Sequence, residues 1–180
     1  MIGAASKTVF AYEVIGIVFV IFLGSALHFT FALSGNLPIV GAFSAVNESV
    51  WEHLKLAFWP SLLFMLIEYP FLRKTANNFF TAKIAGTCLM IIIIPLIFYS
   101  YTAVSGRSIF SIDIFSFVIA VIIGQLISYK LFTYRQMSAS FGKIAIAAII
   151  LLAVAFVFFT FYPPQLQIFQ DSSNGTYGIP

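Results

Sequence analysis

The run "KIAIAAIILLAVAFVFF", residues 143 to 159, has a lysine at its first position and apolar residues at all the others. A helix of this composition is apolar on every face, which is typical of a helix surrounded by lipid. A run of the same character, "LMIIIIPLIFYSY", covers residues 89 to 101. Neither run alternates polar and apolar residues as a membrane β-strand does. Both runs therefore predict membrane-spanning α-helices.

The composition extends this prediction to the whole chain. Of its 180 residues, 61% are hydrophobic and only 8% are charged, so polar side chains are too few to cover a water-facing surface. About 20 apolar residues in a helix cross the roughly 30 Å of hydrocarbon in a bilayer. We predict an all-α helical bundle in one transmembrane domain, with a short tail at 163–180 and five spans at residues 11–33, 54–72, 84–104, 109–129 and 144–162.

The basic residues predict the orientation of the bundle. Two of the nine, Lys55 and Arg107, fall on one side of the predicted spans. The other side receives Lys7, Arg73, Lys74, Lys83, Lys130, Arg135 and Lys143. Because cytoplasmic loops are enriched in Lys and Arg, we expect a multi-pass protein of the cell membrane with a cytoplasmic N-terminus and an extracytoplasmic C-terminus. The net charge of +3 then reflects membrane orientation, and we expect membrane lipids rather than nucleic acid as partners.

A dense polar segment, "SAVNESVWEHLKLAFWP" at residues 44 to 60, interrupts this apolar chain. It lies at the predicted outer start of the second span, and His28 lies one or two turns from the outer end of the first. The connection between the spans contains Gly35 and Pro38 and is expected to turn back, so the two polar patches can meet. Ionisable residues at membrane depth often mark functional sites. The candidate ligand or partner site comprises His28, Asn47, Glu48, Ser49, Trp51, Glu52, His53, Lys55 and Asp171.

Local geometry leaves a structural interpretation of this segment open. Ser44 or Asn47 is expected to cap the second helix, with Glu48 in its first turn. Glu48, Glu52 and Lys55 would then share one helix face. In the structural alternative the segment is only a capped helix start at the interface, anchored by Trp51 and Trp59. In that alternative Lys55 snorkels outward. In a separate metal-free interpretation, which fits an accessory subunit, Glu52 contacts Lys55, and His53 bonds Ser49 or the tail near Asp171.

The residues His28, Glu48, Glu52 and His53 are the ligands we would expect if a metal were bound. However, the H-E-x-x-H spacing is absent, and His53 lies about 100° around a helix from Glu52. A broken first turn would be needed to direct both side chains inward. We therefore expect no stoichiometric transition metal and no cofactor.

The remaining acidic residues are expected to be structural. Glu13, at the inner start of the first span, should snorkel or lie near the N-terminus of the first helix, and Glu68 should pair with Arg73 or Lys74. Asp113 should face Arg107 in the first turn of the fourth span, from where it could also join the outer cluster.

Two segments resemble a known family. The stretch "HFTFALSGNLPIVGAFSAVNESVWEHLKLAFWPSLLFMLIEY", residues 28 to 69, resembles the signature region of a domain-of-unknown-function family of small polytopic membrane proteins in bacteria and archaea. The closing "FQDSSNGTYGI", residues 169 to 179, is similar to its C-terminal pattern. The resemblance implies no activity. It implies that the tail folds beside the polar cluster, and that the recurring residues are His28, Asn47, Glu48, Trp51, Glu52, His53, Lys55, Glu68 and Asp171.

Three function classes remain open from the sequence. The first is a small membrane protein with an outward-facing polar site that acts as a binding component or as an accessory subunit of a larger membrane complex. The second is a metal-dependent intramembrane hydrolase, which needs a metal or an acid and base pair at a lipid-accessible cleft. The third is a small ion or solute carrier, which needs polar groups that continue toward the midplane, where Glu68 and Gln125 are the main candidates.

Overall fold

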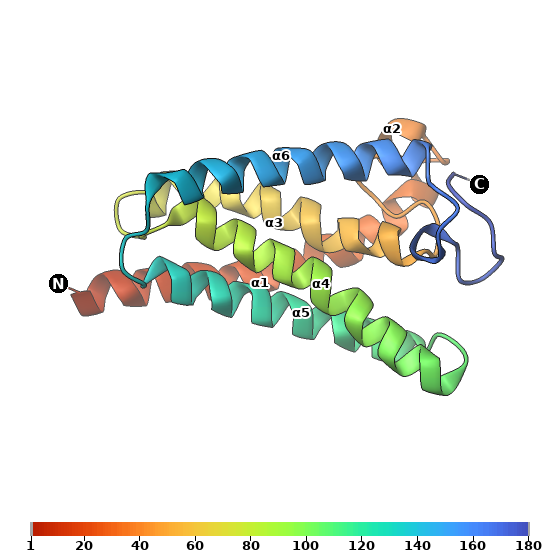
Figure 1. Cartoon of the computed structure of the whole chain (residues 1–180), viewed down its shortest axis with the longest axis horizontal. Coiled ribbons are helices and arrows are strands. Elements are labelled where there is room, and N and C mark those ends of the chain that lie inside the picture. The colour runs from red at the N-terminus through yellow and green to blue at the C-terminus, as the bar shows by residue number, and fades with distance from the viewer. Residues whose placement is uncertain (1, 180) are drawn as a thin grey trace.

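The structure, a computed structural model, describes residues 2–179 and is entirely helical apart from its connections and tail (Figure 1). Within residues 2–179, five helices are long and apolar enough to cross a membrane, which confirms the predicted all-α fold with five spans. The elements in chain order are α1 (Ile2–Leu33), α2 (Pro38–Gly41), α3 (Val50–Leu72), α4 (Phe79–Ser105), α5 (Phe110–Phe132), α6 (Ala139–Phe161) and the short 3-10 helix η1 (Gln167–Phe169).

The helices extend beyond the apolar runs that predicted them. Helix α3 begins at Val50 rather than at residue 54, and α4 begins at Phe79 rather than at residue 84. Hydropathy detects only the apolar part of a span, whereas the helix continues while its backbone hydrogen bonds and its polar side chains have partners. The second span therefore includes Glu52 and His53.

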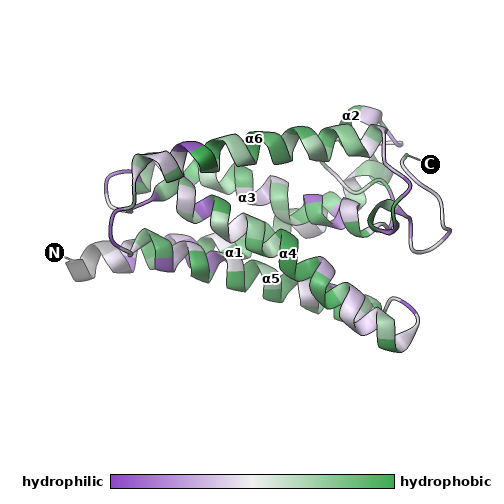
Figure 2. Ribbon diagram, in the orientation of Figure 1, coloured by the Kyte–Doolittle hydropathy of each residue, from purple (hydrophilic) through white to green (hydrophobic). Residues whose placement is uncertain are grey.

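Apolar side chains cover the outside of the bundle. Figure 2 shows hydrophobic colour along the long helices and hydrophilic colour mainly at their ends. Large apolar residues are exposed on every long helix; examples are Phe22 on α1, Leu66 on α3, Ile92 on α4, Phe115 on α5 and Leu151 on α6. Since exposed apolar surface of this extent is stable only in lipid, the chain is a multi-pass membrane protein.

Helix packing follows from small residues at the crossings. Helix α1 packs against α3 and α5, and α4 packs against α3, α5 and α6. At the crossing of α4 and α5 the two backbones are in close contact. A Cβ added to Gly124 would lie only 2.7 Å from the carbonyl oxygen of Gly86, so a larger residue would not fit there. Glycine permits this approach, as is common between transmembrane helices.

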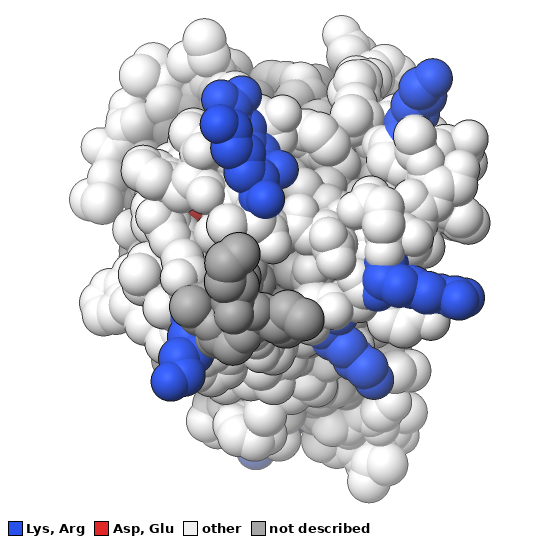
Figure 3. All heavy atoms as spheres, turned by 90° about the vertical axis from the view of Figure 1, so that its left-hand side faces the viewer, with Lys and Arg blue, Asp and Glu red and all other residues white. Residues whose placement is uncertain are grey.

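The two ends of the bundle differ in charge. We call the end with residues 34–49, 106–109 and 162–179 the outer end, after the predicted orientation, and the opposite end the inner end. Figure 3 views the inner end and shows basic side chains spread across it. Its exposed basic residues are Lys7, Arg73, Lys74, Lys130, Arg135 and Lys143, whereas the outer end exposes Arg107. The orientation itself stays a prediction from this asymmetry.

Lys83 is not the loop residue that the sequence suggested. It is buried in α4, where its ammonium nitrogen lies 3.0 Å from Glu13 Oε1, 2.7 Å from Glu68 Oε1 and 3.0 Å from Gln125 Oε1. The expectations that Glu13 snorkels and that Glu68 pairs with Arg73 or Lys74 are therefore wrong. Both acids turn inward because an ammonium in the bundle interior needs nearby negative charge. One lysine thus joins α1, α3, α4 and α5.

Removing this lysine should destabilise the bundle. In Lys83→Met, Glu13 and Glu68 remain buried without their counter-ion, so we expect a loss of about 3 kcal/mol in the free energy of unfolding. Lys130→Met is the matched control, because Lys130 is exposed on α5 and its replacement should cost less than about 0.5 kcal/mol. Chemical denaturation in detergent micelles measures both. Equal stability of the two variants would contradict a structural role for the buried cluster.

The orientation is testable with a matched pair of cysteines. In a Cys88→Ala background, Gln165→Cys places a thiol in the exposed outer tail and Gln136→Cys places one in the exposed connection between α5 and α6. A membrane-impermeant maleimide applied to intact cells should label position 165 and spare position 136 until the cells are lysed. The reverse pattern of labelling would show that the protein is inserted the other way.

Candidate outer-end binding site

The residue at which α3 begins determines how the side chains of the polar segment separate into two clusters. Ser49 is the N-cap, and its Oγ accepts a hydrogen bond from Glu52 N at 3.3 Å. The prediction of Ser44 or Asn47 as the cap is wrong. Asn47 instead accepts from Ser49 N at 2.9 Å with its Oδ1, forming a turn just before the helix. Glu48 therefore precedes the helix, and the prediction that it shares a helical face with Glu52 and Lys55 is also wrong.

Glu52 and Lys55 form a buried pair that faces α6. Their charged atoms are 2.5 Å apart, and the two side chains are 4% and 0% exposed. Lys55 Nζ also donates to Gly41 O and to Thr160 Oγ1, each at 2.7 Å. Glu52 Oε2 accepts from Val46 N at 3.0 Å. The expected contact between Glu52 and Lys55 is thus present, and it fixes the connection from α2 and the end of α6 onto α3.

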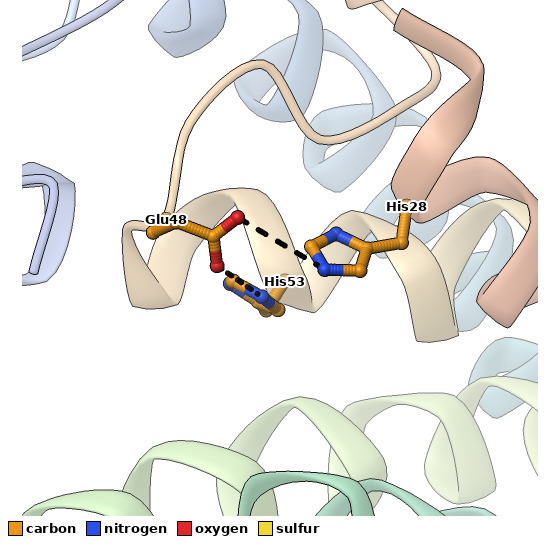
Figure 4. Close-up of side chains that lie close together, drawn as sticks. All are labelled: His28, Glu48 and His53. Carbon is orange, nitrogen blue, oxygen red and sulfur yellow. Dashed lines mark ion pairs between the residues drawn. The ribbon is translucent and has the colours of Figure 1, made fainter. Parts of the chain in front are cut away.

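His28, Glu48 and His53 form a second, more open cluster (Figure 4). His53 Nε2 lies 3.4 Å from Glu48 Oε2, and His28 Nε2 lies 3.9 Å from Glu48 Oε1. His53 Nδ1 is 2.8 Å from Ser49 O, and the two imidazole rings are 5.2 Å apart between centroids. Since α1, the connection and α3 each supply one member, the cluster exists only in the folded chain.

The C-terminal tail closes over the start of α3. Asp171 Oδ2 accepts from Glu48 N at 3.3 Å, and Ser172 Oγ donates to Glu48 O at 3.0 Å. Asn47 Nδ2 donates to Gly178 O at 2.8 Å. The ring of Trp51 packs on Phe169 of η1 at 4.7 Å between centroids. The tail and the polar cluster therefore fold together, and Trp51 anchors the tail rather than a lipid headgroup.

Two carboxyl groups outside the spans have perturbed acidities. Contact with the His53 ring as a hydrogen-bond donor holds the pKa of Glu48 below its usual value, and this outweighs the effect of partial burial. Burial raises the pKa of Asp171, but hydrogen bonds from Ser173 and from the backbone of Glu48 outweigh it, so the net shift is downward. Both groups are therefore ionised at neutral pH.

A cavity of about 370 Å³ opens beside the histidines. Figure 1 shows α4 and α5 diverging from α3 and α6 toward this end. The residues that line the cavity come from α1, α3, α4 and α5, with the connections and the tail at this end. Its ionisable lining residues are His28, Glu48 and His53, together with Asp113 of α5. Its remaining wall is mainly apolar and comes largely from Ile21, Phe29, Leu56, Ile94, Phe98, Phe110, Ile114, Phe117 and Val118.

Part of the cavity wall is continuous with the apolar outer surface of the bundle. Phe29, Phe110 and Ile114 line the cavity and are also exposed on the outside, at 59%, 71% and 48%. Exposed apolar residues within a span contact hydrocarbon. At these residues the cavity wall adjoins the lipid-facing surface.

Asp113 was placed only in part by the sequence. Its Oδ1 accepts from the hydroxyl of Tyr101 at 2.5 Å, so the expected contact with Arg107 is wrong. It does join the outer site as a member of the cavity wall. Ser25 and Ser116 also line the cavity and were not predicted, since single serines in apolar runs carry no recognisable spacing.

The nine candidate residues thus separate by place. Three line the cavity, namely His28, Glu48 and His53. The other six hold the surrounding structure; Glu52 and Lys55 pair internally, Ser49 caps α3, and Asn47, Trp51 and Asp171 hold the tail.

Comparison with known proteins identifies one family. A model described as a family of unknown function (DUF6512) matches residues 4–179. The chain belongs to this family. The match covers nearly the whole chain, which confirms membership of a family without assigned activity; the signature and the bacterial and archaeal range stay expectations. No match to a curated protein or to a solved structure was found.

The lowered pKa of Asp171 predicts how the tail responds to acid. A carboxylate with a depressed folded pKa stabilises the fold fully above its unfolded value, about 3.9, and loses that contribution as the pH falls through the folded value. In a Trp59→Phe background, the emission of Trp51 should stay constant from pH 7 to about 5 and change below about 4. Asp171→Asn should weaken docking of the tail at pH 7 by about 1–2 kcal/mol, because an uncharged amide oxygen replaces the carboxylate as the hydrogen-bond acceptor.

The exposed tail residue Gln165 provides the control. Gln165→Ala should leave both the pH profile and the emission at pH 7 as in the parent. An Asp171→Asn variant with the parent's emission at every pH would show that the carboxylate does not hold the tail.

Proposed function

We propose that this membrane protein binds an amphiphilic molecule in its outer cavity, with an apolar chain along α1, α4 and α5 and a polar head at His28, Glu48 and His53. The observation that carries the proposal is a cavity whose wall is mainly apolar but includes the clustered ionisable side chains of His28, Glu48 and His53. Such a distribution matches a molecule with one polar end, since most ligand sites are apolar with a few polar groups that orient the ligand.

Lateral access supports a lipid-like ligand rather than a water-borne solute. Phe29, Phe110 and Ile114 line the cavity and are also exposed on the lipid-facing surface. In this proposal a molecule dissolved in the bilayer reaches the cavity without crossing water. The tail segment with Ser172 and Ser173 lines the cavity from the opposite, outer side. The protein acts in this proposal as a binding component of the membrane. Association with other membrane-protein subunits stays a prediction.

A metal-dependent intramembrane hydrolase is the second candidate. It is favoured by one observation: His28, Glu48 and His53 each offer a ligand atom, all within 4.8 Å of one another, in the wall of the cavity. Turnover separates the two candidates. A hydrolase would cleave a fluorogenic lipid ester and release its fluorophore. A binding component would leave the ester intact.

Narrowing the cavity should weaken amphiphile binding. Ile114→Trp replaces an aliphatic side chain in the cavity wall with a larger, aromatic one. We expect photocrosslinking of a diazirine-labelled fatty acid to fall about tenfold, equivalent to 1.4 kcal/mol. Leu151→Trp is the matched control, because Leu151 is 71% exposed on α6 and does not line the cavity. Mass spectrometry of the crosslinked peptides locates the probe. Equal labelling of the two variants, with probe spread over all lipid-facing helices, would overturn the proposal.

A further inference from the structure

We propose that His28, Glu48 and His53 bind one divalent transition metal ion of the kind that accepts nitrogen and oxygen ligands, with Zn²⁺ as the representative. The inference deepens the proposed function, because this metal would meet the polar head of the ligand. The sequence objection to a metal was that Glu52 and His53 cannot face the same point on a regular helix. That objection no longer applies, because Glu52 is buried with Lys55 and Glu48 reaches the histidines from the segment before α3.

The separations of the ligand atoms suit a small ion. Around a tetrahedral Zn²⁺ with bonds of about 2.0–2.1 Å, two ligand atoms lie about 3.3 Å apart. The distance from His53 Nε2 to Glu48 Oε2 is 3.4 Å, and that from His28 Nε2 to Glu48 Oε1 is 3.9 Å. The side chains of His28, His53 and Glu48 are 22%, 31% and 50% exposed, so each has room to close the remaining gap.

The hydrogen bonds around His53 orient a metal-binding nitrogen. A backbone carbonyl can only accept, so the contact of 2.8 Å between His53 Nδ1 and Ser49 O places a proton on Nδ1. In the neutral ring, Nε2 then directs its lone pair at a carboxylate oxygen. Either a proton on Nε2 or a metal ion lies between these two atoms, which are 3.4 Å apart, and a metal ion would take the place of that proton. Histidine ligands of metals are commonly held by such a hydrogen bond from the second ring nitrogen.

A metal ion would replace the protons that otherwise link both rings to Glu48. With protons on Nε2 of both rings, each ring directs its proton at a different oxygen of the one carboxylate. A single dication contacts both lone pairs and the carboxylate at once. Asp113 lines the same cavity and adds further negative charge, as does Asp171 through its contact with Glu48 N.

The three ligands leave one coordination position free. Two histidines and one carboxylate with a fourth position open to a cavity are the arrangement of catalytic rather than structural zinc sites. Because the cluster lines the mainly apolar cavity, that position faces the ligand's polar head. A phosphate or carboxylate oxygen is the chemistry that would occupy it.

Metal titration tests the site without any activity assay. Tag-free protein, purified with chelator and then freed of it, is titrated with Zn²⁺ by calorimetry and with Co²⁺ by visible spectroscopy. We expect one ion per chain and a Co²⁺ spectrum of four-coordinate nitrogen and oxygen ligation. Glu48→Gln and His28→Asn should each weaken binding at least about tenfold, as loss of a ligand requires. Arg107→Gln, which replaces an exposed outer residue, is the control and should bind as the parent does.

The outcomes separate the metal from the amphiphile. Folded wild-type protein that takes up no Zn²⁺ or Co²⁺ overturns the metal site, as do folded variants that bind with unchanged affinity. If the variants fail to fold, the stoichiometry and the Co²⁺ spectrum of the wild type decide. Fatty-acid crosslinking in the presence of chelator is measured separately, so the amphiphile site can fail while the metal site stands, and the reverse.

Discussion

The interior of this bundle is governed by the cost of an unpaired charge in a medium that cannot solvate it. Removing one partner of a buried ion pair typically costs several kcal/mol. Lys83 and Lys55 are both almost fully buried, and each is surrounded by oxygen atoms from several parts of the chain. The Lys83 ammonium meets α1, α3 and α5 near the inner end, and the Lys55 ammonium meets α2 and α6 near the outer end. In lipid, where apolar contact does not distinguish a neighbouring helix from a lipid tail, these two lysines specify which helices are adjacent.

The outer site differs from these two lysine clusters in its charge balance and in the exposure of its carboxylate. Glu52 and Lys55 balance each other's charge and exchange hydrogen bonds with the backbone, so they need no external group. Glu48 instead faces two imidazole nitrogens, and its side chain is half exposed at the edge of a cavity. Structural polar groups in proteins are normally satisfied internally, whereas this cluster is partly exposed beside a cavity and has ligand atoms that can bind an added cation.

Sequence reasoning was effective for the fold because lipid imposes one simple constraint. Spans must be long and apolar, and the five runs are visible without any knowledge of their neighbours. The same reasoning was weaker for charges. Lys83 was assigned to a loop because it follows a polar stretch, and its partners Glu13 and Glu68 are 70 and 15 positions away in the chain. Pairing over such distances depends on how helices are arranged, which local patterns do not contain.

In the polar segment, some contacts could be predicted from helical spacing and others depend on the three-dimensional structure. Density of polar residues located the site, and the contacts of Glu52 with Lys55 and of His53 with Ser49 followed from helical spacing. The division into two clusters depends on a single residue, the cap at Ser49. With the helix beginning one turn earlier, Glu48 would lie on the same face as Glu52 and compete for Lys55. Because Ser49 begins the helix, Glu48 stays in the connection, where the tail holds its backbone and its carboxylate is free to face the histidines.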